Sequence, residues 1–409
     1  MKKNKLWTKD FTCITLATIL SSIGGEALNL PISMLVFEKT KSTMASAFIF
    51  ICGMLPDILF QILIAPVIDR GQKKKWIVRM DLLLAALYLG MGVLVQNQSF
   101  QYITYVFFSL AVGFISVLYR LAFNAWYPDL IPKGAEQQGY AVSGAIYPTI
   151  IIVMAPITTY LYAHIAIYHM FYLVVLLTVC SVVIESCITE KKEKTQEEKY
   201  SLKQYGIDLK EGFHFIRRDK GIRNIYTYMS ITCGSGEGVN LLTQAYFQTH
   251  PLLTVSSYGF LKSAEMLGRM LSSVLWYHTS IPEKKRYQFT KFSYTFYQCM
   301  DTILLYLPLP GMMLNRFLCG GIGCGSATIR EAAVKSYLPA NIRARVSAFF
   351  DVVIAIGTIA FQLIAGALGK IMPYRWAAVI ISLFTLLSMF VLIVIPKEVN
   401  RKVYEATRE

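Results

Sequence analysis

Long, uninterrupted apolar segments recur along the whole sequence and limit the folds open to it. A helix needs about 20 apolar residues to cross a bilayer. Because the segments are continuous instead of alternating between apolar and polar residues, they predict spanning helices and exclude a transmembrane barrel. The twelve predicted spans are residues 11–37, 44–68, 76–96, 100–123, 139–162 and 165–188 in the first half, and 222–247, 258–278, 289–307, 312–329, 346–368 and 376–395 in the second.

The composition also predicts a membrane protein. Hydrophobic residues make up 55% of the chain and charged residues 16%, so the apolar surface exceeds what a soluble core of this length can bury. The 40 Lys and Arg residues outnumber the 25 Asp and Glu residues. Nucleic-acid-binding surfaces show such a surplus too, but here the basic residues gather in short runs between apolar segments. This clustering predicts membrane topology and no nucleic-acid partner.

The basic runs predict the orientation of the chain, because positive loops stay on the cytoplasmic side of a membrane. Basic residues precede the first span, join spans two and three between Arg70 and Lys75, and join spans eight and nine between Lys284 and Arg286. Most of the alternate connections carry almost no charge. We therefore expect a multi-pass protein of the cell membrane with both termini in the cytoplasm.

A short pattern, Gly-Glu-x-(Leu or Val)-Asn, occurs at Gly25–Asn29 and again at Gly236–Asn240, 211 residues later. Arg120 and Arg330 form a second matched pair, 210 residues apart. Each is predicted to end a span and is followed by a proline eight or nine residues on. Because both pairs are separated by almost the same number of residues, they indicate that the two halves of the chain are duplicated six-helix units.

The predicted domains are an N-terminal six-helix bundle at 1–188, a cytoplasmic linker at 189–220 and a C-terminal six-helix bundle at 221–409. The fold class is thus an all-α integral membrane protein with twelve transmembrane helices in two pseudo-symmetric bundles. Apolar residues in the linker recur at three- and four-residue steps and predict an amphipathic helix. They are Leu202, Tyr205, Leu209, Phe213 and Ile216. The basic residues from Arg217 to Arg223 are expected to contact anionic lipid headgroups.

Charged residues deep in the predicted spans are the candidates for function, because each costs several kcal/mol unless it faces protein or water. Glu26 and Glu237 lie about fifteen residues into matching spans. Each is interpreted as a protonatable site that also binds a cationic substrate, or as a carboxylate bonded to Asn29 or Asn240 one turn on. Glu26 is the favoured site for proton coupling. Duplicated halves place their substrate site between them, near the midplane.

Other charged residues within the spans have simpler interpretations. Asp57 and Asp301 either face the cavity or are paired for structural reasons. Glu265 and Arg269 are four residues apart, which predicts an ion pair along one helix. The remainder lie within a few turns of a span end, where water or partners are expected to reach them. They are Asp81, Arg120, Glu185, Arg316 and Asp351.

The sequence contains no pattern typical of an enzyme or of a cofactor site. The eight cysteines are never spaced as C-x-x-C, and His164 and His169 do not have the i, i+4 spacing of metal ligands on one helix. A phosphate-binding Gly-rich loop with Lys is also absent, so ATP-driven transport is not expected. We expect no cofactor and no metal. The energy for any transport would come from an ion gradient.

The loop between spans two and three contains the most specific motif. Its sequence, Ala-Pro-Val-Ile-Asp-Arg-Gly-Gln-Lys-Lys-Lys at 65–75, resembles the G-x-x-x-D-R-x-G-R-K signature of the major facilitator superfamily. Asp69, Arg70, Lys73 and Lys74 occupy the charged positions of that signature. Ala65 replaces its first Gly, and the second Gly stands one place early. The length, the six-plus-six topology and the long central loop extend the resemblance over the whole chain.

Within that superfamily the chain is similar to the branch of drug and macrolide exporters. The similarity lies in Ser-Ile-Gly at 22–24, Asp-Leu at 81–82, Pro-Asp-Leu-Ile-Pro at 128–132, Leu-Lys-Glu-Gly-Phe at 209–213 and Tyr-Gly at 258–259. Span five departs from the antiporter pattern, since Ala-Pro-Ile-Thr-Thr at 155–159 keeps only the proline of an expected Gly-Pro run.

The resemblance implies a major facilitator fold that works by alternating access, with the charged loop acting as a cytoplasmic latch. It implies that Asp69 approaches the N-terminus of a helix near Ser347 and that Lys73 pairs with a carboxylate such as Asp129. Alternatively, Arg70 and the lysines, including Lys74, serve topology only.

The function predicted on this basis is proton-coupled efflux of an amphipathic or hydrophobic small molecule. The alternatives are a proton-coupled importer of a small solute and a non-transporting membrane sensor or scaffold. The expected partners are the small-molecule substrate, protons and a bilayer with anionic headgroups, and the protein is expected to be a monomer.

Overall fold

The structure is a computed structural model that describes residues 6–69, 72–132, 135–189, 202–279, 281–339 and 343–406. Throughout these residues the regular structure is helical, and no strand occurs in them. The chain separates into two compact units. Unit 1 comprises Met1–Lys39 and Ile49–Leu202, and unit 2 comprises Thr40–Phe48 and Lys203–Glu409. The domain boundaries expected at 188 and 220 stay a prediction.

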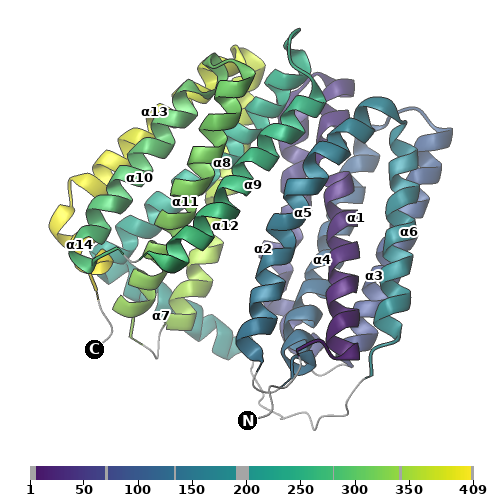
Figure 1. Ribbon diagram of the computed structural model, residues 1–409, viewed down its shortest axis with the longest axis horizontal. Coiled ribbons are helices and arrows are strands. Elements are labelled where there is room, and N and C mark those ends of the chain that lie inside the picture. The colour runs from purple at the N-terminus through teal and green to yellow at the C-terminus, as the bar shows by residue number, and fades with distance from the viewer. Residues whose placement is uncertain are drawn as a thin grey trace. The chain divides into compact units, whose positions relative to one another are not determined.

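Unit 1 is built from long helices that run along a common direction as one bundle (Figure 1). They are α1 (Lys9–Thr40), α2 (Thr43–Asp69), α3 (Lys73–Asn97), α4 (Tyr102–Leu130), α5 (Glu136–His164) and α6 (Ile167–Ser186). Its core contains a cluster of buried side chains that includes Phe11, Ile77, Trp126 and Ile188. Helix α3 packs against both α4 and α6.

Unit 2 contains the remaining helices of Figure 1. They are α7 (Leu202–Arg218), α8 (Lys220–Thr249), α9 (Val255–His278), α10 (Glu283–Ile303), α11 (Leu309–Tyr337), α12 (Arg343–Ile371), α13 (Tyr374–Met389) and α14 (Lys397–Tyr404). A 3-10 turn at Leu304–Tyr306 follows α10, and a π-helical turn at Phe390–Val394 follows α13. A helix is present at the expected place in the linker, as α7, and it buries Ile216.

Eight helices in the described part of the chain are long and apolar enough to cross a membrane, namely α1 to α6, α12 and α13 with its π-helical turn. The other four predicted spans lie in α8 to α11 and fall outside this group. These helices are more polar, and α9, for example, carries Lys262, Glu265 and Arg269. The number of twelve transmembrane helices therefore stays a prediction.

Two helices extend further than the apolar segments indicated. Helix α4 runs to Leu130 and α11 to Tyr337, so Arg120 and Arg330 lie inside helices and do not end them. The expectation that these arginines mark helix ends is wrong. In α4 the added turns are held by packing, since Trp126 and Tyr127 are both buried. A hydropathy segment stops at polar residues even where tertiary contacts continue the helix.

Glycines bring several helix pairs into backbone contact. A Cβ atom on Gly268 of α9 would lie 2.1 Å from the carbonyl oxygen of Phe317, and one on Gly320 of α11 would lie 2.1 Å from that of Glu265. In unit 1, a Cβ atom on Gly113 of α4 would lie 2.2 Å from the carbonyl oxygen of Gly53 on α2. Close helix contacts of this kind are typical of membrane proteins, which use small residues where helices meet.

The C-terminal helix α14 is fastened to unit 2 by buried polar and apolar contacts. Tyr404 is fully buried, and its hydroxyl lies 3.0 Å from that of Tyr294. The π-helical turn leaves main-chain carbonyls without their usual helical partners. Asn400 satisfies two of them by donating hydrogen bonds to the carbonyls of Leu392 and Ile393, at 2.7 and 3.0 Å.

Candidate functional site

Glu26 lies near the middle of α1 and points away from the face that packs on α6. Gly24 occupies that packed face, because a Cβ atom there would lie 3.4 Å from Val174 of α6. Glu26 follows two residues later, about 200° further around the helix. Tyr147 of α5, which is 53% exposed, donates a 3.1 Å hydrogen bond to Glu26 Oε1. The predicted coupling residue is therefore on an accessible surface of unit 1.

Asp57 of α2 forms an ion pair with Arg120 of α4. The glycines of these helices explain the contact, since Asp57 follows Gly53 by one turn and Arg120 follows Gly113 by two turns on the helix pair that they bring together. The side chains of Asp57 and Arg120 are 31% and 46% exposed. Asp57 is therefore paired, and the pair still reaches the surface, so whether Asp57 also faces the cavity stays a prediction.

These charges define an accessible polar surface on unit 1. The Glu26 carboxylate and the Asp57–Arg120 pair lie in the middle parts of α1, α2 and α4, and Asn29 is exposed one turn after Glu26. A charged group at this depth is too costly to face lipid and instead faces protein or water. These groups are therefore the candidates for binding a proton or a cationic group, and their place in a cavity wall stays a prediction.

In unit 2 the predicted residue Asp301 of α10 is buried and forms an ion pair with Arg316 of α11. The two side chains are 1% and 5% exposed, so of the two expectations for Arg316, water or a partner, the partner applies. The Arg316 guanidinium also lies over the Tyr297 ring, 5.8 Å from its centroid. The pair is enclosed within unit 2 and does not form part of an open wall.

Helix α9 carries a charged row next to this pair. Arg269 donates a 3.0 Å hydrogen bond to Glu265, which confirms the ion pair expected from their spacing. Lys262, one turn earlier, was missed by the sequence interpretation. Its ammonium lies 5.8 Å from the Tyr258 ring centroid and interacts electrostatically with Glu265 and with Glu237 of α8. Glu237 is half-buried. Because it interacts with Lys262, it lies beside the charged row of α9 and is not isolated among apolar residues.

Asn240, the second member of the repeated motif, takes part through its main chain. Its carbonyl oxygen accepts a 3.5 Å hydrogen bond from the hydroxyl of Tyr258. The two copies of the motif are therefore in different surroundings, because Glu26 has a tyrosine of α5 beside it and Glu237 has a lysine of α9.

The loop motif shows one of the contacts that the resemblance implied. Lys73 Nζ lies 2.8 Å from Asp129 Oδ2, and this ion pair joins the start of α3 to the end of α4. Lys74 instead donates hydrogen bonds to the carbonyls of Ser186 and Ile188 at the end of α6, at 2.8 and 2.7 Å. Arg70 lies outside the described residues, as do the side chains of Asp69 and Ser347. The latch role of this loop stays a prediction.

Two carboxylates are more buried than their places near span ends suggested. Asp81 and Glu185 were expected where water or partners reach them; they are 2% and 0% exposed, and protein partners reach them instead of water. Proximity to a span end gives the depth of a residue in the membrane but not its burial by neighbouring helices. The signal available in the sequence was the four-residue spacing of Ser181 and Glu185 on an otherwise apolar helix.

A cavity of about 410 Å³ lies elsewhere in unit 1. Glu38, Met91, Tyr105, Tyr162 and Tyr168 are among the residues that line it, and the predicted site residues are not. In the described part of the chain, no group of three or more His, Cys, Asp or Glu residues is placed to hold a metal ion.

The comparison with protein families decides the classification. The sequence model of the Major Facilitator Superfamily matches residues 14–277. The chain belongs to the Major Facilitator Superfamily. The match spans unit 1, the linker and the first helices of unit 2, and it identifies a multi-pass membrane transporter that is not an enzyme. No curated protein matches the chain.

Solved structures of transporters share the fold. A crystal structure of the nucleoside transporter NupG has 12% sequence identity and a TM-score of 0.73, over 95% of this chain and 99% of that one. A POT family transporter in complex with 5-aminolevulinic acid has 11% identity and a TM-score of 0.69, over 95% and 96% of the two chains. At 12% and 11% sequence identity, these similarities show that the folds are alike.

Because the chain belongs to this superfamily, the polar surface of unit 1 is a candidate site for binding a small molecule. Members of this class bind small molecules, and the surface carries a carboxylate, a phenol and an ion pair on the first helices of the chain. It offers both a hydrogen-bonding wall and a group that changes charge on protonation.

Proposed function

We propose that this superfamily transporter exports an amphipathic or hydrophobic small molecule in exchange for protons, by alternating access. The observation that carries the proposal is the Glu26 carboxylate, which is partly exposed in the middle of α1 and hydrogen-bonded to Tyr147. A carboxylate there changes from neutral to negative when it releases its proton. It therefore links the protonation state of the protein to what the polar surface binds.

The chemistry of exchange follows from competition for Glu26. The ionised carboxylate attracts a cationic or hydrogen-bonding substrate, and protonation removes that attraction. A proton arriving from the outside would therefore displace substrate, and release of that proton inside would restore the binding form. Tyr147 donates to the carboxylate, so its phenol orients the group for either ligand.

The direction of transport is inferred from the resemblance to drug and macrolide exporters. The motif 65–75 and the ion pair of Lys73 with Asp129 support a cytoplasmic latch at this loop. Asp69, Arg70 and Ser347 are proposed to complete that latch. Asp57 and Glu237 are proposed to line the substrate path, with Asn29 and Asn240 beside the two glutamates, whereas Asp301 is proposed to hold α10 to α11 through its ion pair.

The proposed setting is the cell membrane, with both termini in the cytoplasm, twelve spans and a monomeric protein. Exposed basic residues at the junction of α7 and α8 support this orientation, because they would lie against anionic headgroups. They are Arg217, Arg218, Lys220 and Arg223.

The test begins with a thermal-shift screen of purified protein, since a ligand that binds the folded state raises its unfolding temperature. The compound with the largest shift is then used for counterflow in proteoliposomes. Exchange of labelled for unlabelled compound is expected, and it should reverse direction with the imposed compound gradient. Absence of exchange for every compound that binds would overturn the transport proposal in favour of a sensor or scaffold.

A further inference from the structure

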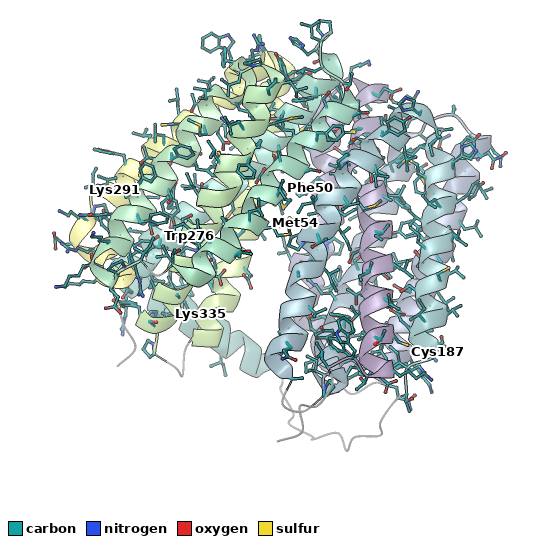
Figure 2. The ribbon with its side chains drawn as sticks, in the orientation of Figure 1. Phe50, Met54, Cys187, Trp276, Lys291 and Lys335 are labelled. Carbon is teal, nitrogen blue, oxygen red and sulfur yellow. The ribbon has the colours of Figure 1, made fainter. Side chains whose placement is uncertain are left out.

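Two acidic side chains that the transport proposal does not use are buried where α3 and α6 pack together in unit 1. Asp81 of α3 is 2% exposed and Glu185 of α6 is fully buried. Figure 2 labels Cys187, the residue directly after α6 and two positions beyond Glu185. Buried carboxyl groups are uncommon and call for a partner.

Hydroxyl groups join the two carboxyl groups in a hydrogen-bonded chain. Ser21 of α1 donates to Asp81 Oδ2 at 3.2 Å, and its oxygen lies 3.0 Å from that of Ser181. The Ser181 hydroxyl lies 3.5 Å from Glu185 Oε1 and 3.2 Å from the carbonyl oxygen of Ala17. The hydroxyl of Tyr119 on α4 donates to the same Oε1 atom at 3.3 Å. Four helices thus supply one connected polar group.

No cation balances this group among the residues that the structure describes, since neither carboxylate forms a salt bridge there. Lys74 approaches the end of α6 but donates to the carbonyls of Ser186 and Ile188. Arg79 of α3 is exposed. Besides Tyr119, the titratable side chain facing the pair is Tyr88 of α3, which interacts electrostatically with Asp81 and brings no positive charge.

A second observation singles out Glu185. Its Oε2 atom is buried and has no hydrogen-bond partner within the described chain. An ionised Glu185 would leave negative charge on an oxygen without a donor, next to a second carboxylate and away from water. Burying one such ion is costly in free energy and burying two is costlier still, whereas a neutral carboxyl group costs far less.

We propose that Asp81 and Glu185 form a proton-binding site that holds one shared proton through the Ser21–Ser181 hydroxyl pair, separate from Glu26. The proton can move along this series of hydrogen bonds without changing the net charge of the group. Glu185 gives its proton to Ser181, Ser181 passes its own to Ser21, and Ser21 passes its own to Asp81. The binding of the proton is a property of unit 1 alone, and its use in coupling rests on the proposed proton-driven transport.

The experiment compares wild-type protein with Asp81→Asn/Glu185→Gln in detergent, without substrate, by measuring the unfolding equilibrium at several pH values near neutrality. A proton held by the folded state and released on unfolding makes the unfolding equilibrium constant rise tenfold per pH unit. The wild type should show this rise relative to the double variant, which has no group to titrate. Asp129→Asn removes a surface carboxylate and should keep the wild-type slope.

Infrared spectroscopy tests the proposed proton-binding site even if the double variant does not fold. The infrared spectrum of native wild type should contain the carbonyl stretch of a protonated carboxylic acid, and Glu185→Gln alone should lose it. Equal pH slopes, or a spectrum without that band, would overturn the site and leave the transport proposal standing. Failure of transport with the band present would overturn the transport proposal and leave the site.

Discussion

The ammonium group of Lys73 lies 2.8 Å from the carboxylate of Asp129 and joins the start of α3 to the end of α4. The side chains are 31% and 37% exposed, so the pair contributes less than about 1 kcal/mol to the free energy of unfolding. The contact was expected from the family resemblance. Because it adds little to stability, we propose that its role lies in the transport cycle.

Lys73→Glu places two carboxylates together at this contact and is expected to slow turnover several-fold with little change in unfolding temperature. The double variant Lys73→Glu/Asp129→Lys restores opposite charges and should recover most of the rate. Counterflow rates in proteoliposomes measure the effect. Equal rates in the wild type and the single variant would show that these residues serve topology only.

Asp301→Asn should be among the most damaging single substitutions in unit 2. It leaves Arg316 charged, buried and without its carboxylate, which costs roughly 3–5 kcal/mol. Asp301→Asn/Arg316→Met removes both charges and should recover much of that loss. Denaturant unfolding in micelles gives both values. Arg269→Gln is the control, because Arg269 is 42% exposed and its loss should cost far less.

The backbone contact between α9 and α11 predicts an effect of a single methyl group. Gly320→Ala would place a Cβ atom 2.1 Å from the carbonyl oxygen of Glu265, so the helices must separate at a cost of about 1–3 kcal/mol. Gly90→Ala in α3 is the matched control. A Cβ atom there meets nothing within 4 Å, and the substitution should stabilise the helix by roughly 0.5–1 kcal/mol. Thermal unfolding of the two variants should therefore shift in opposite directions.

Asp219 connects the start of α8 to the end of α11. Its Oδ1 atom accepts a 2.9 Å hydrogen bond from the main chain of Ile222, and its Oδ2 atom accepts one of 2.7 Å from the hydroxyl of Tyr337. Burial, and then this bond to a carboxylate, raise the pKa of Tyr337 to about 12.

The raised pKa of Tyr337 predicts how stability responds to alkali. The fold favours the neutral phenol, so its stabilisation is complete below the ordinary tyrosine pKa of about 10 and is lost as the pH rises toward 12. The free energy of unfolding should fall more steeply between those values in the wild type than in Tyr337→Phe. Parallel curves for the two proteins would contradict the assignment.

The helices and the contacts along one helix could be predicted from the sequence. Apolar length gave the helices of unit 1, three- and four-residue steps gave α7, and the spacing of Glu265 and Arg269 gave their ion pair. These features depend only on the geometry of a single helix. The Lys73–Asp129 pair came from the resemblance, because its partners are far apart in the chain.

Contacts between helices could not be predicted in the same way. Arg120 reaches Asp57 because Gly53 and Gly113 bring α2 and α4 together. Glu185 is enclosed because the Tyr119 hydroxyl of α4 contacts it, and because Ser181 links it to Ser21 of α1. Each depends on how a helix is rotated about its axis, which follows from packing against neighbours. Hydropathy alone does not determine how a helix is rotated about its axis.

Transport driven by a pH gradient in proteoliposomes, measured for wild type and Glu26→Gln, tests the central claim most directly. Counterflow on the same vesicles shows that the variant folds and binds, and Glu283→Gln, a substitution of an exposed carboxylate at the start of α10, is the control. The proposed role of Glu26 predicts that Glu26→Gln keeps counterflow but loses gradient-driven transport, while Glu283→Gln keeps both. Gradient-driven transport at the wild-type rate in Glu26→Gln would contradict it.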